Sequence, residues 1–192
     1  RNYLSSTADT WELQAFHRAR LGWGSLAVLD TLNETAIAAA GRRDPEEIKQ
    51  QIHEMRLRLE STVSGQVGQL EVKRSEGGIV DVEFLVQYLV LTGRLPWSAE
   101  TANYYSALTG RCASAIGESD CAALLAGYRV LRGVENTMRL VSGGKDSAIP
   151  VQSGNALAAA RSLGFETVEM LQSALEEVKA EVRRIYCRHL ID

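Results

Sequence analysis

The chain has 192 residues, of which 45% are hydrophobic and 23% are charged, and its net charge is −3. This length and composition suit a globular domain with a buried core, and they exclude a disordered tail, a collagen-like repeat and a disulfide scaffold. The slight acidic excess argues against nucleic acid as a partner, and the lack of an 18-residue apolar run argues against a membrane. Ala and Leu occur 23 times each against three prolines, a composition that favours helix.

Cysteine and histidine are few and scattered. Three of each occur, without a Cys-x-x-Cys pair, so we expect no metal site and no disulfide, and a reducing, cytoplasmic location. The chain begins with an arginine and has no signal peptide. We therefore expect a piece of a longer polypeptide, with part of the function in sequence outside it.

Helix signals recur along the chain. The first helix begins at Asp9 or Thr10, where Glu12 can complete a capping box, and the second covers about 25–40. The third begins after Asp44 as its cap, with a proline at its first position.

The segment 69–76 interrupts this periodicity, and two glycines end the interruption. Residues 79–91 are apolar nearly all round, and because thirteen residues are long for a strand, we expect a helix buried on most sides. The later helices are expected at about 99–116, 119–141, 153–164 and from 168 almost to the end. The prediction is an all-α fold, a single bundle-like domain of about eight helices over 1–192, in which the sequence pattern identifies no strand.

The stretch Ser142-Gly-Gly-Lys-Asp-Ser147 spells a signature of ATP pyrophosphatases. That loop works after a buried strand and before a helix, so that its amides face a pyrophosphate. Here residues 127–141 have helical periodicity, and Pro150 disfavours a helix directly afterwards. We therefore expect a glycine-rich helix end, and reject the pyrophosphatase interpretation unless a strand precedes Ser142.

A second candidate site is the stretch Gly77-Gly-Ile-Val-Asp-Val-Glu-Phe84. On a strand, Asp81 and Glu83 would share one side and could hold a metal ion, as in nucleotidyltransferases. On a helix they lie about 200° apart and could not. The helix is favoured: paired glycines allow a close backbone approach, and Asp81 suits a first turn. Glu83 then needs a cationic partner. The candidates are Arg18, Arg20, Lys73 and Arg74.

The third candidate is the stretch 10–20, where Arg18 shares a helix face with Trp11 and Ala15. A charge on that face indicates either an anion or buried carboxylate nearby, or a long side chain that reaches the surface. Our hypothesis is that Arg18 or Arg20 pairs with Asp81 or Glu83.

Three stretches together resemble one family. They are Trp11-Glu-x-Gln-Ala-x-x-Arg-Ala-Arg20, Gly77-Gly-Ile-Val-Asp-Val-Glu-Phe-x-x-Gln-Tyr88 and Glu135-Asn-Thr-Met-Arg-Leu140. They are similar to glutamine synthetase adenylyltransferase, in the helical domain that follows a nucleotidyltransferase domain, and more similar to its C-terminal half. The resemblance implies structural roles for Trp11, Glu12, Gln14, Gly77, Gly78, Gln87, Glu135, Asn136 and Arg139.

The resemblance also implies a function. The full enzyme uses ATP and magnesium to transfer AMP to a tyrosine of glutamine synthetase, removes it by phosphorolysis, and responds to glutamine and the PII protein. Its nucleotidyltransferase domain would lie upstream, so we expect no catalytic residue, metal or cofactor in this chain. Gly24-Ser25 stands where the family usually has Gly-Asp.

The resulting prediction is an accessory and regulatory domain, inactive by itself. Arg18, Arg20, Asp81 and Glu83 would form a polar network at the contact with the catalytic domain, or lie near the phosphates of the nucleotide. The alternative is a non-catalytic interaction module that docks PII or glutamine synthetase, in which these residues are merely structural.

Overall fold

The computed structural model describes residues 3–4, 7–64, 67–144 and 148–192. Within these ranges the elements are α2 (Thr10–His17), α3 (Leu26–Ala40), α4 (Pro45–Ser61), β1 (Gln69–Glu71), α5 (Ile79–Leu91), α6 (Tyr104–Gly110), α7 (Ala113–Ile116), α8 (Glu118–Val141), β2 (Ala148–Pro150), α9 (Gly154–Ser162) and α10 (Val168–Leu190). The predicted all-α fold is confirmed, with nine helices in the described part of the chain.

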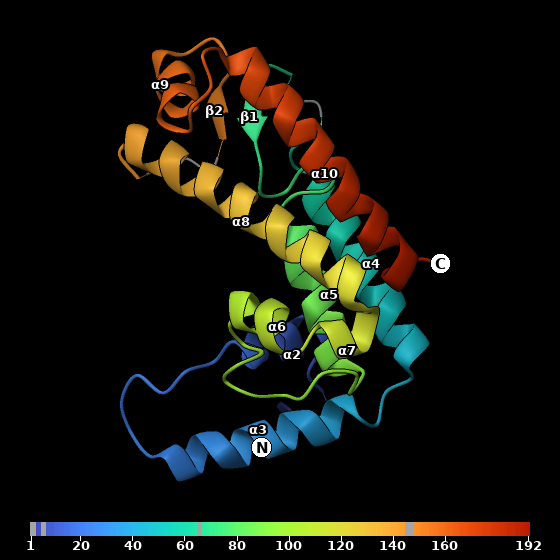
Figure 1. Cartoon of the computed structure of the whole chain (residues 1–192). Coiled ribbons are helices and arrows are strands. Elements are labelled where there is room, and N and C mark those ends of the chain that lie inside the picture. The colour runs from blue at the N-terminus through green and yellow to red at the C-terminus, as the bar shows by residue number, and fades with distance from the viewer. Residues whose placement is uncertain (1–2, 5–6, 65–66, 145–147) are drawn as a thin grey trace.

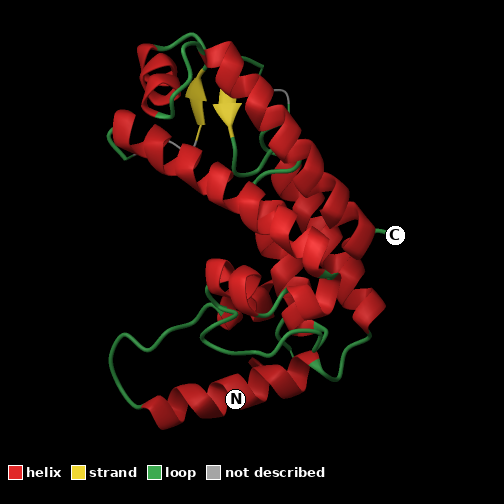
Figure 2. Cartoon of the chain, in the orientation of Figure 1, coloured by secondary structure: helices red, strands yellow, loops and turns green. Residues whose placement is uncertain are grey.

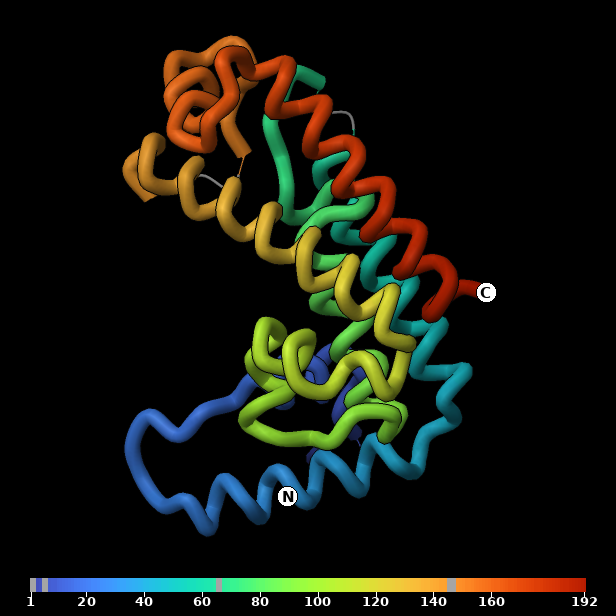
Figure 3. Tube along the Cα trace, in the orientation of Figure 1, coloured from blue at the N-terminus to red at the C-terminus, as the bar shows by residue number. Residues whose placement is uncertain are grey.

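The centre of the molecule is α5, which packs against α4, α8 and α10 (Figure 1). Twelve of its thirteen residues are buried, because its side chains are apolar on nearly every side. The two long helices α8 and α10 converge near α5 and diverge toward α9 and the strands, while α2, α3, α6 and α7 lie at the opposite end (Figure 3). The core is thus built around a helix without a solvent-facing side.

The two strands were not predicted. β1 and β2 pair antiparallel, with Leu70 opposite Ile149, and form a two-stranded sheet at the end of the molecule near α9 (Figure 2). Each strand has three residues, too few to show an alternating pattern in the sequence.

The capping residues in the sequence predicted most helix starts correctly. The side chain of Asp44 accepts a hydrogen bond from the Glu46 amide at 3.0 Å, and Ser153 accepts one from the Ala156 amide at 3.1 Å. The capping box of Asp9 with Glu12 also forms. These short-range bonds satisfy amides that lack a partner within the helix.

One expectation about the helices was wrong. The stretch 99–116 is not one helix but two, α6 and α7, because Asn103 caps a new start: its side chain accepts hydrogen bonds from the amides of Tyr105 and Ser106. In α2 Trp11 is 51% exposed, and the buried side of the helix carries Thr10, Leu13, Gln14 and His17.

The turn before α5 confirms the expected close backbone approach. Gly77 has φ +68°, and a Cβ there would lie 2.0 Å from the carbonyl oxygen of Lys179 in α10. Gly78 is the N-cap of α5, and its Cβ would lie 2.8 Å from the carbonyl oxygen of Lys73. Only glycine fits the space between this turn and the neighbouring backbone.

Candidate functional site

Asp81, in the first turn of α5, is fully buried and strongly bound within the domain. Its carboxylate pairs with the Nε of Arg56 in α4 and, at 3.2 Å, with Nη1 of Arg183 in α10. The amide of Gly77 donates a further hydrogen bond at 2.9 Å. Asp81 therefore joins α4, α10 and the glycine turn to α5, and it has no surface to offer another domain.

Glu83 lies on a different side of α5 and faces α8. Its Oε1 pairs with Nη2 of Arg132 at 2.5 Å. The same guanidinium donates to the Tyr128 hydroxyl at 3.0 Å and to Oε2 of Glu135 at 2.7 Å. Burial raises the pKa of Glu83, while the positive charge of Arg132 opposes that rise. Arg132 thus uses three nitrogens to hold three partners in place.

Further cations surround Glu135, which is fully buried. Nη2 of Arg139 lies 2.9 Å from Oε1 of Glu135, and the Lys73 ammonium lies 4.0 Å from the same oxygen. The side chains of Arg139 and Lys73 remain 43% and 32% exposed. Asn136, one residue further along α8, points to solvent. The carboxylates are therefore inside and the cations at the rim.

A buried amide pair connects α2 to this site. Nε2 of Gln14 donates to Oε1 of Gln87 at 2.6 Å, and Nε2 of Gln87 donates to the Tyr104 hydroxyl at 2.5 Å. The guanidinium of Arg18 lies over the Tyr104 ring, 5.0 Å from its centroid. Burial raises the pKa of Tyr104, so its hydroxyl stays protonated. This is how the two stretches noted in the sequence, 11–20 and 77–88, meet in space.

We call the connected charged groups on this side the polar strip. Arg18 and Lys73 both act electrostatically on Glu83, as does Glu135. The strip holds four cations and two carboxylates, so its charge is positive although the chain is acidic. Its members are Arg18, Lys73, Glu83, Arg132, Glu135 and Arg139.

The expected pairing of Arg18 or Arg20 with Asp81 or Glu83 was wrong. No ion pair joins them within the described ranges, and both arginines are exposed. Arg18 reaches the surface, which agrees with the alternative that a long side chain on this helix extends to solvent. Sequence reasoning missed Arg56, Arg132 and Arg183; the position of Arg132 one turn before Glu135 on α8 was the available signal for one of them.

The structure also bears on two other interpretations. Asp81 and Glu83 are held by different arginines, and the described part of the chain contains no cluster of His, Cys, Asp or Glu able to hold a metal ion. A helix, α8, continues to Val141, so the strand that a pyrophosphatase loop requires does not precede Ser142. Residues 145–147 of that motif lie outside the described ranges.

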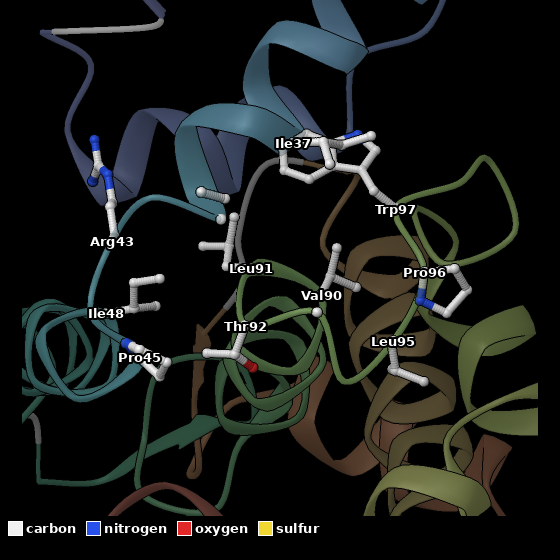
Figure 4. Close-up of a pocket in the computed structure, with 13 residues that line it drawn as sticks. Ile37, Arg43, Pro45, Ile48, Val90, Leu91, Thr92, Leu95, Pro96 and Trp97 are labelled. Carbon is white, nitrogen blue, oxygen red and sulfur yellow. The ribbon is translucent and has the colours of Figure 1, made fainter.

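A pocket of about 310 Å³ lies away from the polar strip, between the end of α3, the start of α4 and the end of α5 (Figure 4). Ile37, Leu91 and Trp97 line it with apolar surface. Arg43 stands at its edge, where Nη1 donates to the Thr10 hydroxyl at 2.8 Å. None of the predicted site residues lines this pocket.

The fold and the polar strip define a helical domain organised around one buried helix with charged groups on two sides. No helix in the described ranges is long and apolar enough to cross a membrane. The chain belongs to the family described as GlnD PII-uridylyltransferase, whose family profile matches residues 46–190.

Curated relatives confirm the resemblance to glutamine synthetase adenylyltransferases. The chain is 31% identical to the bifunctional glutamine synthetase adenylyltransferase/adenylyl-removing enzyme of Corynebacterium diphtheriae, over 99% of this chain and 19% of the relative. It is 30% identical to the enzyme of that name from Caulobacter vibrioides, over 96% of this chain and 19% of the relative. The chain is also 35% identical to the enzyme of that name from Mycobacterium avium, over 72% of this chain and 14% of the relative. The chain spans less than a fifth of the length of these relatives.

Proposed function

We propose that the chain is a helical accessory and regulatory domain of a bifunctional glutamine synthetase adenylyltransferase. The complete enzyme transfers AMP from ATP to a tyrosine of glutamine synthetase and removes it by phosphorolysis, in the cytoplasm. ATP and magnesium bind to a nucleotidyltransferase domain elsewhere in the polypeptide, and the 192-residue chain alone transfers no AMP. The names and lengths of the curated relatives support this assignment.

The observation that carries the proposal is the polar strip. Arg132 is fixed by Tyr128, Glu83 and Glu135, so the centre of the strip is preorganised. Arg18 at one end and Arg139 at the other keep donors directed to solvent. A rigid row of cations is suited to acidic groups on a protein surface, because little ordering is required on binding. We assign this surface, together with the exposed Arg20 that follows Arg18 by two positions, to the nucleotidyltransferase domain, whose orientation it fixes.

The test is AMP transfer to glutamine synthetase by the full-length polypeptide. We expect Arg18→Ala, Arg20→Ala and Glu83→Ala each to lower turnover about tenfold, the equivalent of ~1.4 kcal/mol. Arg161→Ala is the matched control, since Arg161 is an exposed arginine on α9, outside the strip. Circular dichroism establishes that each variant is folded. Unchanged turnover in the Arg18, Arg20 and Glu83 variants alike would refute the proposed contact.

The same variants address the alternative function, a module that docks PII or glutamine synthetase. That alternative requires normal basal turnover together with a lost response to PII, or a raised KM for glutamine synthetase. A fall in turnover at saturating glutamine synthetase, with the PII response retained, supports the contact with the catalytic domain.

A further inference from the structure

The first half of α3 is an apolar helix that the described chain leaves uncovered. Leu26 and Val28 are 66% and 59% exposed, and Trp23 in the preceding loop is 96% exposed. Every buried residue of α3 lies in its last five positions: Ala36, Ala39 and Ala40. In Figure 1, α3 runs along the lower edge of the molecule, and the loop 18–25 joins the first residues of α3 to α2.

We call this surface the apolar arm and define it as Leu21, Trp23, Leu26 and Val28. The four side chains occupy eight consecutive positions, and Leu21 folds back beside Gly24, where a Cβ would lie 3.8 Å from its Cδ1. A clustered apolar patch on a soluble domain marks an interaction site. Short helices gain most of their stability from packing an apolar face, and residues 26–35 of α3 include no fully buried side chain in the described structure.

Charge restricts what can cover the arm. Asp30 and Glu34 are the only charged residues between positions 21 and 41, so all the charge that this segment carries is negative. A second copy of the arm would bring these carboxylates toward one another. A surface that combines apolar side chains with Lys or Arg at its rim meets both requirements.

We propose that the apolar arm docks onto another part of the same polypeptide, at an apolar surface with a basic rim. This rests on the proposed function, in which the chain is one domain of a longer enzyme. The matches to the relatives from Corynebacterium diphtheriae and Caulobacter vibrioides cover 99% and 96% of this chain, so they extend over the arm, while about four fifths of each relative lies outside the match. The occupant therefore belongs to that larger remainder of the polypeptide.

The test compares amide hydrogen exchange at residues 26–35 in the 192-residue chain and in the full-length polypeptide. The 192-residue chain has its own core and serves as the uncovered reference. We expect exchange about tenfold slower or more in the full-length protein, and a loss of that protection in Leu26→Gln. Leu140→Gln is the control, because Leu140 is an 82% exposed leucine on another helix; it should leave the protection unchanged.

Two results would overturn the proposal. One is equal exchange of 26–35 in both proteins. The other is protection of the arm in the 192-residue chain that appears only as it dimerises in sedimentation, which would assign the arm to a second copy. AMP transfer by the unmodified full-length protein is measured in parallel: its absence refutes the proposed function, whereas its presence with an unprotected arm refutes the docking surface alone.

Discussion

Asp81 and Glu83 show how a carboxylate is accommodated in a nearly all-apolar helix. A buried charge is strongly destabilising unless it is paired and hydrogen-bonded. Asp81 meets two arginines and an amide in a closed site, while Glu83 meets one arginine at the boundary of the core. The first arrangement stabilises the packing of α4, α5 and α10, and the second leaves charge at the surface.

Removing one of the two arginine partners of Asp81 should strongly destabilise the folded protein. We expect Arg56→Met to lower the free energy of unfolding by about 3–5 kcal/mol, because Asp81 would keep a buried charge with less compensation. Arg58→Met is the matched control on the same helix, since the Arg58 side chain is 75% exposed; it should change stability by less than about 0.5 kcal/mol. Urea denaturation measures both. A similar small effect for the two variants would contradict the assigned role.

His17 makes stability depend on pH. It is 3% exposed, and burial lowers its pKa from 6.5 to about 4, so the folded state favours the neutral ring. Its contribution is complete above pH 6.5 and is lost as pH falls toward 4, by roughly 3 kcal/mol. His17→Gln should remove this part of the acid destabilisation. Parallel stability profiles for the two proteins between pH 7 and 4 would show that His17 does not cause it.

At the level of the elements, the turn before α5 packs directly against α10, because the Lys179 carbonyl oxygen would lie 2.0 Å from a Cβ at Gly77. Gly77→Ala combines a left-handed backbone with a steric clash, and we expect a loss of about 3 kcal/mol or more. Gly93 also has a positive φ, +73°, but open space around it. Gly93→Ala should therefore lose only about 1 kcal/mol. Thermal unfolding measures both, and equal losses would contradict the close approach.

Sequence reasoning succeeded where the determining contact is local. The bounds of α5 and the caps at Asp44 and Ser153 depend on residues within four positions. It failed where the contact is distant: Arg132 lies 49 positions from Glu83, and Arg183 lies 102 positions from Asp81.

The molecule as a whole presents two surfaces of opposite character. The polar strip beside α5 and α8 is rich in cations with buried counter-charges, whereas the apolar arm at the start of α3 is hydrophobic, and the helix that follows it carries only the negative charges of Asp30 and Glu34. The stretch 18–25 runs between them, since Arg18 belongs to the strip and Trp23 to the arm. Two such surfaces suit a domain that is held by its neighbours in a larger enzyme, rather than one that acts alone.

The most direct measurement of that claim is complementation. A full-length polypeptide that lacks these 192 residues is assayed for AMP transfer to glutamine synthetase, before and after the 192-residue chain is added as a separate protein. Our account predicts that the truncated enzyme loses most of its turnover, that the added chain restores a measurable part of it, and that the chain alone transfers no AMP. Full turnover without the chain, or AMP transfer by the chain alone, would contradict it.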